Sequence, residues 1–163
     1  MKRLLPVLCL TIAVFLGSVG VSWGADYQKG YAAYDRGDYA TALREWKPLA
    51  KQGNFSAQYL LGVMYHNGKG VPQDDKSALK WFTLAAEQGY ARAQYNLGVM
   101  YANGRGVIQD YVRAHMCFNI AASSGNKKAS YNRDIVAKLM TSNQIETAQR
   151  LARECVRKKY KGC

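Results

Sequence analysis

Apolar residues recur along the middle of this chain at the three- and four-residue spacing of an amphipathic helix. The first such segment carries Ala57, Leu61, Met64 and Tyr65, and it stops at Asn67, directly before a glycine. A second stripe comes next, made of Ala78, Phe82, Ala85 and Ala86, and ends at Gly89. The pattern therefore predicts two successive helices separated by a short connection.

The connection between these helices has the composition of a tight loop. Gly68 and Gly70 can adopt positive φ, and Pro72 cannot continue a helix. Asp74 or Asp75 can then cap the second helix, where a carboxylate meets the positive end of the helix dipole. We expect a helix–loop–helix unit.

This unit occurs twice in the same phase. Residues 57–92 and 93–128 align without a gap and are identical at about 19 of 36 positions. Degenerate copies flank them at 25–56 and at 129–163, the latter predicted as a capping helix pair with a basic tail. One helix pair cannot bury both of its apolar sides, so stacking of successive units is predicted to form the core.

Each full copy also places a glycine inside its first helix. Gly62 and Gly98 each cost about 1 kcal/mol relative to alanine. We interpret them as points where the second helix approaches closely, with Phe82 and Phe118 filling the space beside Tyr65 and Tyr101.

The repeated residues resemble the Sel-one-like repeat of the tetratricopeptide superfamily, strongly over 57–128 and weakly on either side. The residues that carry the resemblance are Leu61, Gly62 and Tyr65, the loop Gly68, Gly70 and Val71, and Ala78, Phe82 and Ala85. The resemblance implies an all-α fold, a right-handed α-solenoid of antiparallel helix pairs. The loop is some four residues longer than a plain tetratricopeptide turn, which separates the two families.

By the same resemblance, such arrays act as scaffolds, and the first helix of each unit lines their concave face. The candidate partner-binding residues are Tyr59, Val63, His66, Asn67, Arg92, Tyr95, Val99 and Asn103. Tyrosine offers contact area at low entropic cost, and an amide can bond a peptide backbone. The alternatives are that the tyrosines pack between neighbouring helices and that the asparagines only end a helix before glycine.

The first residues differ in kind from the repeats. Lys2 and Arg3 precede an uncharged run from Leu4 to Val21, and small residues come after it, as in a secretory signal peptide. We assign 1–24 to this segment and expect a periplasmic or secreted protein. A retained membrane anchor is the alternative, because the run is about long enough to reach across a bilayer.

The C-terminal part carries charge and cysteine. Six basic residues succeed one another at helical spacing and in the tail: Arg150, Arg153, Arg157, Lys158, Lys159 and Lys161. They could meet an anionic envelope surface, or they could form the solvated face of a capping helix that begins at Thr141 with Gln144 in a capping box. Cys155 and Cys163 are the candidate disulfide, and two free thiols are the alternative.

Candidate chemistry is sparse. His66 and His115 lack further ligands at metal-binding spacing, and we interpret them as a polar groove residue and a surface residue. Cys117 stands where the preceding copy has Trp81, which indicates a buried thiol. The glycine loops lack the strand and the lysine–serine/threonine end of a phosphate-binding loop. The sequence therefore predicts no catalytic residue, metal site, cofactor or small-molecule substrate, and export disfavours nucleic acid as a partner.

The function predicted from these features is a non-enzymatic scaffold that binds a protein or peptide through the concave face. One alternative is an envelope enzyme like the β-lactamase-like, cysteine-rich relatives. Those carry a cysteine pair in each unit, whereas residues 57–92 have none, and no serine-x-x-lysine segment comes with its supporting motifs. The other alternative is a structural protein held on anionic surfaces by its basic terminal helix.

Overall fold

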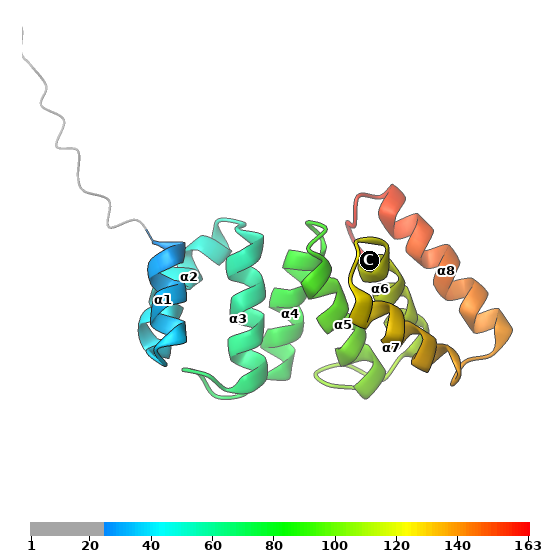
Figure 1. The fold of residues 1–163 in the computed structure, drawn as a ribbon, viewed down its shortest axis with the longest axis horizontal. Coiled ribbons are helices and arrows are strands. Elements are labelled where there is room, and N and C mark those ends of the chain that lie inside the picture. The colour runs from blue at the N-terminus through cyan, green and yellow to red at the C-terminus, as the bar shows by residue number, and fades with distance from the viewer. Residues whose placement is uncertain (1–24) are drawn as a thin grey trace, which may run out of the picture.

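A computed structural model describes residues 25–163, and these residues form helices and loops without a strand (Figure 1). The predicted signal segment, 1–24, lies outside the described residues. The eight helices are α1 (Tyr27–Asp35), α2 (Tyr39–Lys51), α3 (Phe55–Asn67), α4 (Asp75–Ala86), α5 (Ala91–Asn103), α6 (Tyr111–Ser123), α7 (Lys127–Ala137) and α8 (Ser142–Arg157). The all-α solenoid predicted from the repeats is confirmed.

The first seven helices alternate between two layers. We call α1, α3, α5 and α7 the A layer and α2, α4 and α6 the B layer; Figure 1 shows the pairs succeeding one another along the long axis. Each B helix packs against the A helix before it and the A helix after it. The core is therefore continuous from unit to unit, as stacking of incomplete helix pairs requires.

Local sequence sets the ends of these helices. The side chains of Asp38, Asp74 and Asp110 accept hydrogen bonds from the first backbone amides of α2, α4 and α6. Gly68 and Gly104 adopt left-handed conformations with φ of 66° and 65° and end α3 and α5. The predicted aspartate caps and glycine turns are confirmed, and so is the capping box at the start of α8.

A glycine and an aromatic ring join the two layers in each unit. A Cβ atom built on Gly62 would lie 2.6 Å from Cδ1 of Phe82, and one on Gly98 would lie 2.5 Å from Cε1 of Phe118. Trp46 approaches Gly30 in the same way in the first unit. The predicted close approach is confirmed, and it extends to the degenerate first unit.

The last helix departs from this arrangement. In α7 the position equivalent to Gly98 is Asp134, and α8 contains no aromatic residue that could fill the place of Phe118. Lacking that contact, α8 packs against α6 in the B layer instead of forming a pair with α7. The tail then reaches back toward α4, where the Gly162 amide donates to the Glu87 carboxylate at 3.2 Å.

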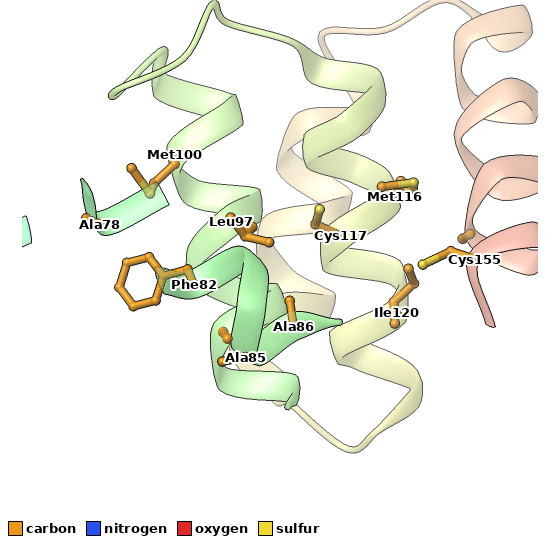
Figure 2. Packing of buried hydrophobic residues seen from close by; sticks show 12 residues of the cluster. Ala78, Phe82, Ala85, Ala86, Leu97, Met100, Met116, Cys117, Ile120 and Cys155 are labelled. Carbon is orange, nitrogen blue, oxygen red and sulfur yellow. The ribbon is translucent and has the colours of Figure 1, made fainter. Parts of the chain in front are cut away.

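The displaced α8 encloses α6. Figure 2 shows Met116, Cys117 and Ile120 of α6 facing a core that also contains Leu97 of α5, with Cys155 of α8 on the other side. His115 is buried as well, with 4% of its surface exposed. Its interpretation as a surface residue is wrong, because the sequence did not reveal that three helices pack around α6.

Candidate binding surfaces

The tyrosines proposed for partner binding lie between helices. The Tyr59 ring lies 5.8 Å from Phe82 and 5.2 Å from Tyr90, and burial raises the pKa of its hydroxyl. Tyr95 lies 5.8 Å from Phe118, and its hydroxyl accepts a hydrogen bond from the Asn132 amide at 3.2 Å. Both rings are half-buried, so each supports the stacking of units and retains only part of its surface for a partner.

The candidate asparagines are exposed, but their side-chain amides donate hydrogen bonds to the backbone. The side-chain amide of Asn67 donates to the Val63 carbonyl at 2.9 Å, and that of Asn103 donates to the Val99 carbonyl at 2.8 Å. Each bond reaches the carbonyl four residues earlier in the same helix, so the side-chain amide is already used within the protein. The two valines are half-buried.

His66 belongs to a contact between units. Its Nδ1 lies 2.8 Å from a carboxylate oxygen of Asp75, and Arg105 from the next glycine loop donates to the other oxygen at 3.1 Å. One unit earlier, Lys69 donates to the Tyr34 hydroxyl at 3.1 Å. In both cases the basic residue between the two loop glycines reaches back to the preceding unit. These contacts within the protein account for the basic side chain, so no bound ligand is needed to explain it.

Aromatic residues gather where α1, α3 and α5 begin. The rings of Phe55 and Tyr90 lie 5.1 Å apart, and Phe55 is 44% exposed. Tyr27 lies near Tyr90 and Arg92, and burial raises the pKa of its hydroxyl. Tyr31, one turn further along α1, is 46% exposed.

We call Tyr27, Tyr31, Phe55, Tyr59 and Tyr90, together with the exposed Arg92, the aromatic cluster. Of these six residues, only Tyr59 and Arg92 were among the candidates from the sequence. The others were missed because Phe55 precedes the first aligned copy, Tyr90 is replaced by Asn126 in the second copy, and α1 belongs to the degenerate unit. A search for aromatic residues at the start of each A helix would have found Tyr27, Phe55 and Tyr90.

The six basic residues of the C-terminal region are all exposed. Arg150 is paired with Glu154 at 2.7 Å, four residues along the same helix. Arg153, Arg157, Lys158, Lys159 and Lys161 take part in no ion pair among residues 25–163. The outer face of α8 is therefore a positively charged surface.

The cysteines of the described residues form one disulfide and one buried free thiol. Cys155 and Cys163 are joined by a disulfide with Cα atoms 5.6 Å apart. Cys117 is a free and buried thiol, and burial raises its pKa to about 12, which suppresses the nucleophilic thiolate. A cavity of about 50 Å³ beside it, lined in part by Gln94, Tyr160 and the disulfide, is far smaller than the roughly 300 Å³ at which ligand pockets begin.

Metal ligands and membrane-spanning segments would each leave a recognisable pattern in the helices. Among residues 25–163, no three histidine, cysteine, aspartate or glutamate side chains converge as a metal site would need. Within this part of the chain, no helix has the length and apolar character required to cross a bilayer.

Comparison with known proteins agrees with this architecture. A sequence model of the Sel1 repeat matches residues 55–90 and 91–126, so that each match starts with an A helix. A protective antigen of uropathogenic Escherichia coli with an SLR fold is 33% identical, with a TM-score of 0.77, over 80% of this chain and 29% of that one. A Sel1 repeat protein from Oxalobacter formigenes is 33% identical, with a TM-score of 0.64, over 66% of this chain and 44% of that one.

This chain thus spans less than half of the length of either solved relative. A comparison with curated proteins returned no match.

Proposed function

Because this chain belongs to the Sel1 repeat proteins, we propose that it is a non-enzymatic scaffold that binds a protein or an extended peptide through the outer side of its A layer. This side corresponds to the concave face of tetratricopeptide arrays. The aromatic cluster is the observation that carries the proposal. It spans the first turns of three successive A helices, leaves Tyr31 and Phe55 nearly half exposed, and includes the cationic Arg92 at the second position of α5.

The chemistry of the cluster suits a protein segment. Aromatic and arginine side chains dominate the energetics of protein interfaces, because they bury large areas while losing few rotamers. The rings are held by one another at 5.1 and 5.2 Å, so little order is lost when a partner binds. A partner that offers apolar side chains and a carboxylate to Arg92 would complement this surface.

We further propose that the scaffold works outside the cytoplasm. Lys2, Arg3 and the uncharged run after them are typical of an export signal. The disulfide between Cys155 and Cys163 supports the same location, because such bonds persist mainly in oxidising compartments. Protease protection of the protein in intact cells, compared with cells whose outer layer is opened, tests this location.

Peptide selection followed by titration tests the binding surface. Peptides are selected on the purified protein from a random displayed library, and their dissociation constants are measured for the wild type, Tyr31→Ala and Phe55→Ala. We expect each variant to weaken binding by at least about fivefold, the effect of roughly 1 kcal/mol at an interface. Ile108→Ala is the matched control, since Ile108 is 88% exposed on the loop at the opposite end of α5.

The titration can refute the proposal in two ways. A library that yields no binder would count against a peptide-binding scaffold. Peptides whose affinity is the same for the wild type and both cluster variants would place the binding surface elsewhere.

The exposed basic face of α8 favours a second role, attachment to an anionic envelope surface. Five of the six cations of α8 and of the tail after it have no acidic partner among the described residues. Co-sedimentation with phosphatidylglycerol vesicles should fall when Arg153 and Arg157 are changed to glutamate, and it should fall with added salt because charge-driven binding is screened. If binding fell neither with the glutamate substitutions nor with added salt, this role would be ruled out.

A further inference from the structure

The helix α7 exposes an apolar stripe at the C-terminal end of the array. Tyr131, Ile135 and Leu139 succeed one another at four-residue steps, with Leu139 in the turn after the helix. Their exposed fractions are 69%, 42% and 60%. Four-residue steps place them along one side of the helix, so together they form a continuous apolar surface.

The preceding units show what this surface is shaped to contact. Tyr131 is the third member of a series with Tyr59 and Tyr95, and Ile135 is the third member of a series with Val63 and Val99. Tyr59 packs against Tyr90, at the start of the next A helix, and Tyr95 receives the amide hydrogen bond of Asn132 from the next A helix. At these positions each unit contacts the helix of its successor.

At α7 this contact has no counterpart in the described chain. The close approach of a B helix is lost with Asp134 in the glycine position, and α8 packs on α6. Figure 1 shows α8 at the C-terminal end of the array, where it runs back alongside α6. The positions that would be half-buried in a continuing array are therefore open on α7.

The two ends of the array differ in character. If Gly30 is superposed on Gly62, Lys29 takes the place of Leu61, and Ala32 takes the place of Met64. The outer side of the first unit thus carries a lysine and a small residue where the next unit has two large buried apolar side chains, as in a capping repeat. Such a surface does not complement the apolar stripe of α7, which argues against head-to-tail stacking of copies.

Charge defines the partner further. Lys127, Lys128 and Lys138 flank the stripe, and none of them takes part in an ion pair among residues 25–163. The one acid of the helix, Asp134, is paired with Arg133 at 2.9 Å. Two copies joined through antiparallel α7 helices would bring these lysines together, so an acidic partner is favoured over a second copy.

We propose that α7 binds an amphipathic helix of an acidic partner protein, which continues the array in place of a further repeat. The partner helix presents apolar side chains to Ile135 and Leu139, an asparagine or glutamine amide to the Tyr131 hydroxyl, and carboxylates to the flanking lysines. This surface is separate from the aromatic cluster and from the basic face of α8.

A designed peptide tests this surface directly. The probe is a fluorescent helical peptide of about 18 residues, or five turns, with leucines along one side, one asparagine among them and glutamates on both flanks. Its matched control carries lysine in place of every glutamate. Binding to the purified protein is measured by fluorescence anisotropy for the wild type, Tyr131→Ser, Ile135→Ser and, as the protein control, Ile108→Ser.

We expect the acidic peptide to bind the wild type and Ile108→Ser alike, and to bind Tyr131→Ser and Ile135→Ser at least about tenfold more weakly. The lysine peptide should bind at least about tenfold more weakly than the acidic one, with the difference shrinking at high salt. The variants should remain folded because both substituted side chains are exposed, and circular dichroism checks this. Tyr31→Ala and Phe55→Ala should bind the acidic peptide normally, which separates this test from that of the aromatic cluster.

Four results would overturn the proposal. The acidic peptide fails to bind, or both peptides bind equally, or the α7 variants bind as the wild type does. A dimer in analytical ultracentrifugation that Ile135→Ser dissociates would also overturn it, because a second copy would then be the occupant.

Discussion

Adding one methyl group at Gly62 is expected to destabilise the protein, although alanine favours a helix over glycine. The new Cβ would lie 2.6 Å from both Cδ1 and Cε1 of Phe82. Carbon atoms pack best at about 3.5 to 4.0 Å, so the ring would have to move by about 1 Å. Phe82 is 1% exposed, which leaves it little room to do so.

The two contributions can be weighed against each other. Alanine gains about 1 kcal/mol in helix propensity, whereas overpacking in a core costs about 1 to 3 kcal/mol. We therefore expect Gly62→Ala to lower the free energy of unfolding by up to about 2 kcal/mol. In a Phe82→Leu background the ring atoms are absent and the leucine can turn away, so the same substitution should be neutral or stabilising by up to about 1 kcal/mol.

Urea unfolding monitored by far-ultraviolet circular dichroism measures all four proteins of this cycle. The expected coupling energy between the two positions is about 1 to 3 kcal/mol. Gly98→Ala with Phe118→Leu provides an independent copy of the same cycle, since the corresponding Cβ would lie 2.5 Å from Phe118. If Gly62→Ala had the same effect in both backgrounds, the idea that glycine is present to admit the ring would be refuted.

Three further predictions concern the cysteines and a buried histidine. Reducing the disulfide, or substituting Cys163→Ser, should lower the free energy of unfolding by about 2 to 3 kcal/mol because the closed loop is short, and an unchanged urea midpoint would show that the bridge does not constrain the unfolded chain. Cys117, whose pKa is raised to about 12 by burial, should not react with a thiol reagent at pH 8 until urea unfolds the protein, so rapid labelling of the native protein would contradict its burial. Burial lowers the pKa of His115 below its ordinary 6.5, so the stability that its neutral form provides is present above pH 6.5 and is lost as the pH falls through the lowered pKa. The urea midpoint should therefore fall less between pH 7.5 and pH 5 for His115→Leu than for the wild type, and equal decreases would assign the acid sensitivity to other groups.

Much of the fold can be read from local sequence. The spacing of Ala57, Leu61 and Met64, the two loop glycines and the capping aspartate specify a helix pair, because caps, turns and amphipathic stripes are local properties. The repetition of that pair specifies the solenoid, because each unit must bury its apolar side against the next. The burial of Cys117 could be predicted in the same way, from its place in the series with Trp81.

The binding surfaces were predicted less well, since exposure depends on residues distant in the sequence. Tyr59 and Tyr95 were selected by their recurrence, and the structure shows that their rings contact Phe82 and Phe118. Their equivalent Tyr131 was not selected, although it is the most exposed of the three. The difference arises because a further A helix packs beside Tyr59 and Tyr95, whereas no helix of the described chain occupies that place beside Tyr131.

The sequence by itself determined the repeat, the helix ends and the close approach of the two helices at Gly62 and Gly98, because these depend on residues within one unit. The path of the last helix was decided only in the tertiary structure. Asp134 and the lack of an aromatic residue in α8 remove the contact that pairs the two layers, and α8 buries its stripe of Ala148, Ala152 and Cys155 against α6 instead. That packing leaves α7 open, because an apolar stripe specifies that a surface must be covered but does not specify which neighbour covers it.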